Sequence, residues 1–160
     1  MGESTTALAD HHSSAISIAE IEALIRDELP FAAESGITIE RLAAGEARVR
    51  LPAHNRLLRP GGTISGPAMM GLADFTMYAV VLSRLGPAKN VATTNLNANF
   101  LRRPAPVDLI AEGRLIKLGK RLAYGEVTLY SDGDDDPVCH VTSTYSIPPM
   151  AGGKAVDAVS

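Results

Sequence analysis

Apolar positions along the chain change their spacing in a way that separates helical from extended segments. Between Ser17 and Pro30 they recur three and four positions apart, as at Ile21 and Ile25, which is the spacing of one helix face. The letters SIAE at the start of this segment form a Ser-x-x-Glu capping box. A helix is therefore predicted from Ser17, with Pro30 and Gly36 marking its end.

Alternation of apolar and polar residues, which is the pattern of half-buried strands, begins after this helix. In EARVRL, Ala47, Val49 and Leu51 alternate with arginines. Extended segments are predicted over residues 36–43, 46–53, 90–103, 107–118, 121–131 and 137–147. Short turns join the last three, which indicates an antiparallel meander.

The segment SGPAMMGLADFTMYAVVLSRLG, residues 65–86, is apolar on nearly every face. Ser65 is a suitable N-cap, Pro67 is tolerated in a first turn, and Gly86-Pro87 would end the helix. A helix that is apolar all round must be surrounded by other elements. The segment therefore predicts a central helix, too interrupted by polar residues and Pro67 to span a membrane.

The order of the predicted elements indicates the fold class. A short helix, two strands, a long apolar helix and three or four strands make an α+β pattern. An antiparallel sheet curled around the central helix would bury that helix on most sides. This is the hotdog arrangement, and we predict it as a single domain over residues 17–147, with tails at 1–16 and 148–160.

Composition and charge exclude several classes of protein. The formal net charge of −3 over 160 residues lacks the basic excess typical of nucleic-acid binders. The N-terminus has no signal-peptide pattern, and a single cysteine, Cys139, predicted in a strand, suits a reducing compartment. His11 and His12 fall in the predicted tail. We therefore expect a cytoplasmic protein that binds neither nucleic acid nor membrane, with no metal or redox cofactor.

Asp74 lies in the middle of the apolar helix and needs a compensating partner. One alternative is an ion pair with an arginine, for which the candidates are Arg59, Arg84, Arg102 and Arg103. The other is a catalytic role, because Ser65, Gly66 and Pro67 present backbone N–H groups at the positive end of the helix dipole. An acid and an oxyanion donor are the parts of an acyl-transfer site.

The spacing of Gly66 and Asp74 imposes a condition on that second alternative. Eight residues of helix separate the two by about 12 Å along the axis and about 80° around it. One small carbonyl group cannot contact both. A two-fold dimer would solve this by placing Gly66 of one chain opposite Asp74 of the other. The catalytic hypothesis therefore requires a homodimer, and whether dimers pair into tetramers stays open.

The letters GGTISGPAMMGLADF, TTNLNANFLRRPA and KLGKRLAYGEV together resemble the hotdog acyl-CoA thioesterases of the phenylacetate-pathway (PaaI-like) group, over residues 36–147. The resemblance implies that Asp74 acts as general base or nucleophile and that the Gly66 N–H polarises the thioester carbonyl. It also implies a helping hydroxyl from Thr93 or Thr94. The family histidine is Ser65 here, which is included in the expected catalytic set.

The resemblance also implies where the substrate binds. The family asparagine six residues before that histidine is replaced by Arg59, and Asn55 or His54 in the same loop could substitute; for His54 a surface-loop role is the alternative. Basic residues of the strand meander, with Arg102, would meet the phosphates of coenzyme A, although an ordinary solvated turn is the alternative. The expected substrate- and coenzyme-binding residues are Arg59, Asn55, Pro67, Arg103, Lys117, Gly119, Lys120 and Arg121.

These observations favour an acyl-CoA thioesterase that yields a free acid and coenzyme A, the coenzyme being part of the substrate. Two alternatives remain open: a non-catalytic acyl-CoA-binding protein, and a hotdog hydratase or dehydratase. The latter chemistry needs a histidine beside the acid, and His54 is the candidate.

Overall fold

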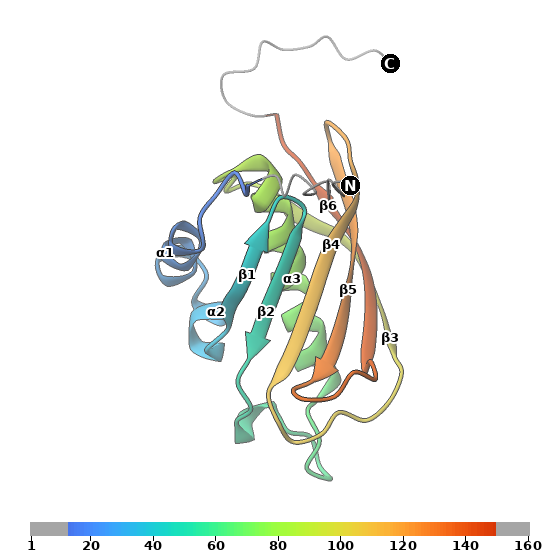
Figure 1. Ribbon diagram of the computed structural model, residues 1–160. Helices are drawn as coiled ribbons and strands as arrows, with labels where there is room; N and C mark the ends of the chain where they lie inside the picture. The colour runs from blue at the N-terminus through green and yellow to red at the C-terminus, as the bar shows by residue number, and fades with distance from the viewer. Residues whose placement is uncertain (1–12, 150–160) are drawn as a thin grey trace, which may run out of the picture.

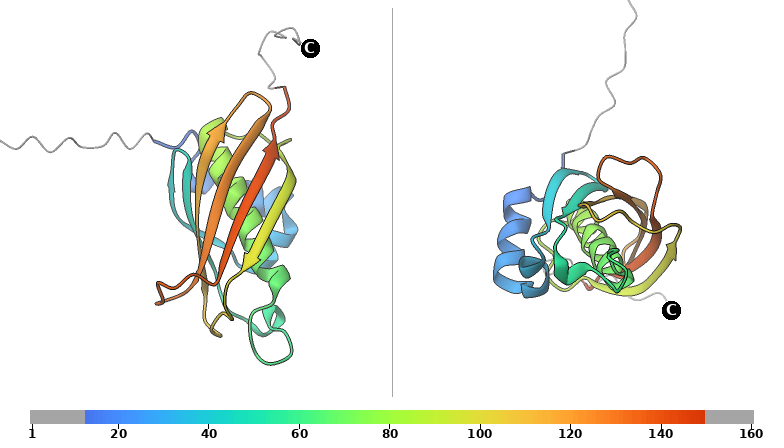
Figure 2. Two further views of the ribbon diagram at one scale, coloured as in Figure 1. Left: turned by 90° about the vertical axis from the view of Figure 1, so that its right-hand side faces the viewer. Right: turned by 90° about the horizontal axis from the view of Figure 1, so that it is seen from below.

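A long helix, α3 (Gly66–Leu85), lies against the concave face of a strongly curved sheet in the computed structural model, which describes residues 13–149 (Figure 1). The sheet has six strands in the order β1-β2-β4-β5-β6-β3, and every neighbouring pair is antiparallel. The strands are β1 (Thr38–Ala43), β2 (Glu46–Leu51), β3 (Ala92–Phe100), β4 (Leu109–Leu118), β5 (Leu122–Ser131) and β6 (Cys139–Ser146). Seen along the helix axis, the sheet curls around α3 (Figure 2). The predicted α+β hotdog fold is confirmed.

Small residues in the sheet allow α3 to lie close to it. A Cβ added at Gly113 would lie 2.9 Å from the Thr76 side chain, and one at Gly125 would lie 2.7 Å from the Met77 sulfur. The central helix thus rests on the two longest strands at a distance that only glycine permits at these positions. The hydroxyl of Thr76 donates to the Leu72 carbonyl at 2.7 Å, so this buried polar group is satisfied within the helix.

The predicted N-terminal helix forms with its capping box. The Ser17 hydroxyl accepts from the Glu20 amide, while the Glu20 carboxylate accepts from the Ser17 amide, at the start of α1 (Ile18–Glu28). The first helix ends just before Pro30, as predicted, but Pro30 also opens a second helix that was not predicted, α2 (Pro30–Ser35). Proline suits the first turn of a helix, where its missing N–H is not needed, so it began a new element here. Gly36 ends α2 in a left-handed conformation.

The predicted N-terminal tail was too long by its last residues. Ile16 is 3% exposed in the core, and the Ala15 amide donates to the Ser83 carbonyl at 2.8 Å. The packed part of the chain therefore begins before Ser17, because Ile16 is buried in the core. The rest of that tail, with His11 and His12, lies outside the described residues, as does the C-terminal tail beyond residue 149.

The two edges of the sheet differ in how they are protected. Strand β1 carries charged residues, and helix α1 packs beside it. Strand β3 has no charged residue and no proline, and seven of its nine residues are exposed. Figure 1 shows β3 at the free right-hand edge of the sheet. Uncharged, uncovered edge strands are pairing sites for other chains.

Ion pairs link neighbouring strands on the convex face of the sheet. Arg50 pairs with Glu40, Asp108 and Asp132, which joins three elements distant in sequence. Asp132 belongs to the acidic SDGDDD loop between β5 and β6, in which Asp134 and Asp136 also pair with an arginine. The neighbouring guanidinium lowers the pKa of the Asp132 carboxyl.

By length and mean hydropathy, α3 meets the criterion for a membrane-spanning helix despite its interruptions. The sheet nevertheless buries 61% of its most apolar 18-residue window. Wrapping by the sheet is thus a sufficient reason for the apolar sequence of this helix. Cys139 is likewise a core residue, and burial raises the pKa of its thiol to about 11.

Candidate active site

Asp74 projects from the middle of α3 toward the start of β3 and lines a cavity of about 480 Å³. Apolar side chains from three elements surround it, among them Phe31 of α2 and Phe75 and Tyr78 of α3. The acid is half-buried in the single chain rather than fully buried as the apolar helix suggested, because the sheet leaves this side of α3 uncovered.

Two hydroxyl groups hold one oxygen of the Asp74 carboxylate. Thr93 Oγ1 donates to Oδ1 at 2.7 Å, and the Tyr145 hydroxyl lies 2.8 Å from the same oxygen. Within residues 13–149, Oδ2 has no hydrogen-bond donor. One oxygen is therefore fixed by the protein, and the other is left for a water or a substrate.

The choice between Thr93 and Thr94 follows from a β-bulge. Thr93 lies opposite Tyr145 on β6, whereas the register shifts at the next residue. The Thr94 hydroxyl consequently donates to the Thr144 carbonyl at 3.2 Å and does not reach Asp74. The structure thus places Thr93 beside the acid.

No arginine pairs with Asp74 in the described part of the chain, so the alternative of a structural ion pair is not realised. Arg102 instead pairs with Asp134 and Asp136 in the β5–β6 loop, at 3.2 and 2.6 Å. The carboxylate of Asp74 is compensated by neutral hydroxyl donors, which leaves it available for chemistry.

Gly66 opens α3 at a second cavity, of about 440 Å³, which Arg59 and Arg103 also line. The Ser65 hydroxyl accepts from the Ala68 amide at 3.3 Å and caps the helix. The Gly66 amide has no acceptor among the described residues, as expected in the first turn of a helix. The ring of Phe100 lies over Gly66, 3.4 Å from where a Cβ would stand.

Gly66 and Asp74 line separate cavities, and the two cavities have no lining residue in common. The geometry within one chain therefore agrees with the helical spacing: a single protomer does not bring the acid and the candidate oxyanion donor to one reacting carbonyl. Of the expected catalytic set, Asp74 and Thr93 are brought together, while Ser65 and Gly66 lie apart from them at the start of α3.

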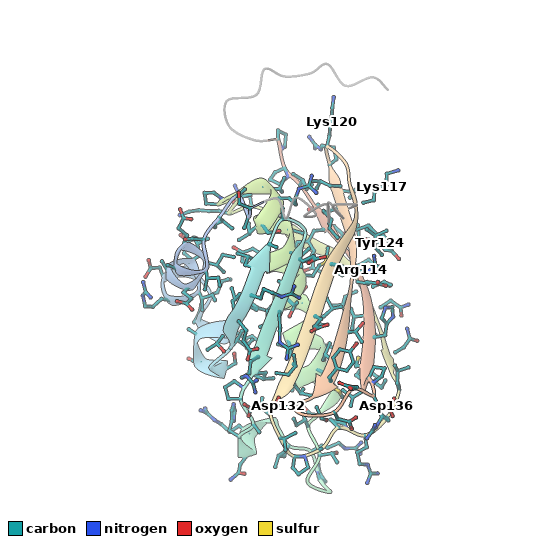
Figure 3. All side chains as sticks on the ribbon, viewed as in Figure 1. Arg114, Lys117, Lys120, Tyr124, Asp132 and Asp136 are labelled. Carbon is teal, nitrogen blue, oxygen red and sulfur yellow. The ribbon has the colours of Figure 1, made fainter. Side chains whose placement is uncertain are left out.

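The expected basic cluster is divided in one chain, which corrects the prediction. Lys117, Gly119, Lys120 and Arg121 lie around the β4–β5 turn, and Figure 3 shows Lys120 and Lys117 at the top of the molecule. Arg103 lies beyond the other end of the sheet, since β6, which spans about 23 Å at about 3.3 Å per residue, separates the level of Ala92 from that of Phe100. Sequence proximity to the meander could not reveal this, because β3 pairs with β6 and runs toward the opposite end.

Three other residues considered for substrate binding, Asn55, Pro67 and His54, line neither cavity. Asn55 is exposed at the start of a short 3₁₀ helix (Asn55–Leu57), and Pro67 is exposed in the first turn of α3. His54 is not among the residues lining the Asp74 cavity, and its buried Nε2 has no hydrogen-bond partner within the described segment. The residues 13–149 bring no three His, Cys, Asp or Glu side chains together as a metal site.

Sequence reasoning missed three residues that shape the site: Tyr145, Phe31 and Phe100. The one available signal for Tyr145 was its alternation with Val141 and Ser143, which predicts an inward-facing side chain on the last strand. Phe31 is 75% exposed and lies over Gly71 at the rim of the Asp74 cavity, a contact that no local pattern predicts.

Comparisons with known proteins identify the family of the chain. Residues 61–138 match the family model described as the thioesterase superfamily. A Halobacterium salinarum protein, provisionally named an esterase, is 34% identical over 104 residues, covering 62% of this chain and 68% of that protein.

Solved structures show the same fold. One from Silicibacter sp. TM1040, provisionally named a thioesterase, is 40% identical and has a TM-score of 0.78, with 88% of this chain and 97% of that chain covered. The phenylacetic acid degradation protein PaaI of Thermus thermophilus, as a mutant, is 24% identical, with 74% and 99% covered and a TM-score of 0.66. The chain therefore belongs to the thioesterase superfamily of thioester-hydrolysing enzymes, as its resemblance to hotdog thioesterases indicated.

Proposed function

We propose that the protein is an acyl-CoA thioesterase that adds water across the thioester bond and releases a free acid and coenzyme A. Asp74 acts as general base on the attacking water or as nucleophile. The N–H of Gly66 of the partner subunit polarises the thioester carbonyl. Each reaction centre thus needs two chains.

The observation that carries this proposal is the state of the Asp74 carboxylate. Its Oδ1 accepts from two hydroxyls, its Oδ2 is open, and the side chain lines a largely apolar cavity next to an uncovered sheet edge. A structural carboxylate on an apolar helix would be paired with a cation. An acid held by neutral donors at a cavity wall is suited to accept a proton from water.

Strand β3 supplies the surface through which the second copy joins. It is an exposed edge without charges, and its last residue, Phe100, is 52% exposed. Antiparallel pairing of β3 with its symmetry mate would satisfy the free backbone groups and continue the sheet into the partner. A two-fold axis makes this contact identical from both sides.

The register of that pairing follows from the site. Because Thr93 bonds Asp74 and Phe100 covers Gly66, Thr93 must stand level with Phe100 of the partner subunit. A two-fold axis at Asn97 achieves this, since Thr94 is the extra residue of the bulge. The segment NLNAN is nearly palindromic about Asn97, so asparagines face asparagines on the convex face and Leu96 faces Ala98 on the concave face.

The same pairing would reunite the divided basic residues. The β4–β5 turn with Lys120 lies at the end of the sheet where β3 begins, because Leu122 and Ala92 both stand level with Ser146. An antiparallel partner strand ends at this point and would carry its Arg103 there. The coenzyme phosphates would then meet residues from both chains.

Replacement of the family histidine by Ser65 is compatible with turnover in this arrangement. The Ser65 hydroxyl caps α3 and so fixes the first turn, from which the Gly66 amide projects. The oxyanion contact comes from backbone, and backbone donors do not depend on the identity of residue 65.

The test is release of free thiol from short, long and aromatic acyl-CoAs by the purified protein and by Asp74→Asn. We expect turnover by the wild type and at least a hundredfold loss in the variant, with the dimer and its melting temperature retained. Near-normal turnover by Asp74→Asn would remove Asp74 from the mechanism. Tight binding of acyl-CoA without thiol release would favour the non-catalytic alternative.

A further inference from the structure

Tyr145 is a residue that neither the sequence motifs nor the family resemblance singled out. It lies on β6, is 3% exposed, and places its hydroxyl 2.8 Å from Asp74 Oδ1 and 2.9 Å from the Asp74 carbonyl oxygen. A phenol has one proton, so both acceptors share a single donor. The contact ties the acid and its own backbone to the sheet.

We propose that Tyr145 is a positioning residue for the reaction: it holds Asp74 Oδ1 so that Oδ2 faces the thioester and the water. This inference rests on the proposed function, because it concerns the orientation of the proposed base. Tyr145 does not touch substrate in this scheme and neither gains nor loses a proton. The proton of the attacking water goes to Asp74.

Geometry distinguishes the roles of the two hydroxyls on Oδ1. Thr93 lies on the exposed edge strand, whereas Tyr145, which lines the same cavity, is 3% exposed and lies on the strand next to it, β6. Without the phenol, the carboxylate could turn about its terminal torsion, which is broad for aspartate. Oδ1 and Oδ2 would then exchange places, and a smaller fraction of molecules would present the base correctly.

The environment of Tyr145 keeps it in the donor form. Burial, followed by the neighbouring Asp74 carboxylate, raises the pKa of the Tyr145 hydroxyl well above its usual value. The phenol therefore stays protonated across the pH range in which a thioesterase would be assayed. A donor that never titrates can orient the acid without competing for its proton.

The experiment compares kcat and KM for acyl-CoA in Tyr145→Phe with those of the wild type. Phenylalanine keeps the ring and removes only the donor. We expect kcat to fall about tenfold to a hundredfold, as for loss of one hydrogen bond to a charged group, with KM within twofold. The matched control is Tyr130→Phe on β5, distant from the cavity, which should leave both constants unchanged.

The dependence of kcat on pH provides a readout that a purely structural role would not change. Removing a donor from the ionised carboxylate makes it easier to protonate, so the acidic limb of the profile should move to higher pH in Tyr145→Phe. Glu28, Lys89 and Tyr78 also line the cavity, and they are unchanged in the variant, so the difference reports on Asp74.

The outcomes separate this proposal from the proposed function. If Asp74→Asn is inactive while Tyr145→Phe keeps wild-type kcat and pH profile, the positioning role is overturned and the function stands. If Tyr145→Phe loses activity only through a lower melting temperature, with an unmoved pH profile, the residue is structural and the proposal is again overturned. Full activity of Asp74→Asn would instead overturn the function itself.

Discussion

A proline at position 66 would remove one amide hydrogen from the proposed reaction centre, and it shares with an alanine there the cost of a Cβ just before Pro67. Gly66 is the first residue of α3, where proline is well tolerated and the N–H has no helical acceptor. Ser65 has ψ 154°, which is compatible with a following proline. The matched control is Gly66→Ala, which also adds a Cβ against the half-exposed Phe100 ring but keeps the N–H.

Removing one oxyanion donor typically lowers kcat by about a hundredfold to a thousandfold, or about 2.7–4 kcal/mol of transition-state stabilisation. We therefore expect that loss in Gly66→Pro, and a much smaller effect in Gly66→Ala, in a thiol-release assay with acyl-CoA. Both variants should melt close to the wild type. Equal activity of the two variants would refute the role of the amide.

Mixing variants tests whether the site is shared between chains. In a hybrid of Gly66→Pro with Asp74→Asn, one reaction centre contains both defects and the other contains neither. Each hybrid dimer should thus recover about half of the wild-type activity, and a statistical mixture, in which about half of the dimers are hybrids, about a quarter. If Gly66 and Asp74 of the same chain formed the site, every centre would carry one defect and no activity would return.

Three further predictions concern packing, charge and coenzyme binding. Gly125→Ala should destabilise the fold by about 1–3 kcal/mol in urea unfolding, because its Cβ would lie 2.7 Å from the Arg114 carbonyl oxygen, which cannot move aside as the Met77 side chain can; an unchanged midpoint would contradict this close packing. Arg50 lowers the pKa of Glu40, so the stability from this pair is present at neutral pH and lost as the pH falls below about 4.5. In Arg50→Gln the melting temperature should therefore fall less steeply with decreasing pH than in the wild type. An equally steep fall would contradict the stabilising role of the Arg50–Glu40 pair. Lys120→Glu combined with Arg121→Glu should raise KM for acyl-CoA several-fold at low salt, and an unchanged KM would exclude the phosphate role.

Local patterns were sufficient for most of the elements. The spacing of Ile21 and Ile25, the capping box at Ser17 and the alternation in the strands predicted helices and strands close to their observed bounds. The all-round apolar α3 also indicated its wrapped position. These features depend on which side chains are buried and on how backbone groups within a few residues are hydrogen-bonded. The spacing of apolar and capping residues in the sequence reflects both directly. The second helix, which begins at Pro30, was missed because proline can both end one helix and begin another.

The sequence by itself determined that an acid stands on an apolar helix eight residues after a glycine that opens it. Only the tertiary structure decided what surrounds that acid. The Tyr145 hydroxyl reaches Asp74 from 71 residues away, and the bulge at Thr94 selects Thr93 over its neighbour. The register of the β3–β6 pairing determines both contacts. The antiparallel direction of the same pairing places Arg103 and Lys120 at opposite ends of the sheet. Such register depends on pairing between distant segments, where one residue of shift reverses every side chain, so no local pattern in the chain encodes it.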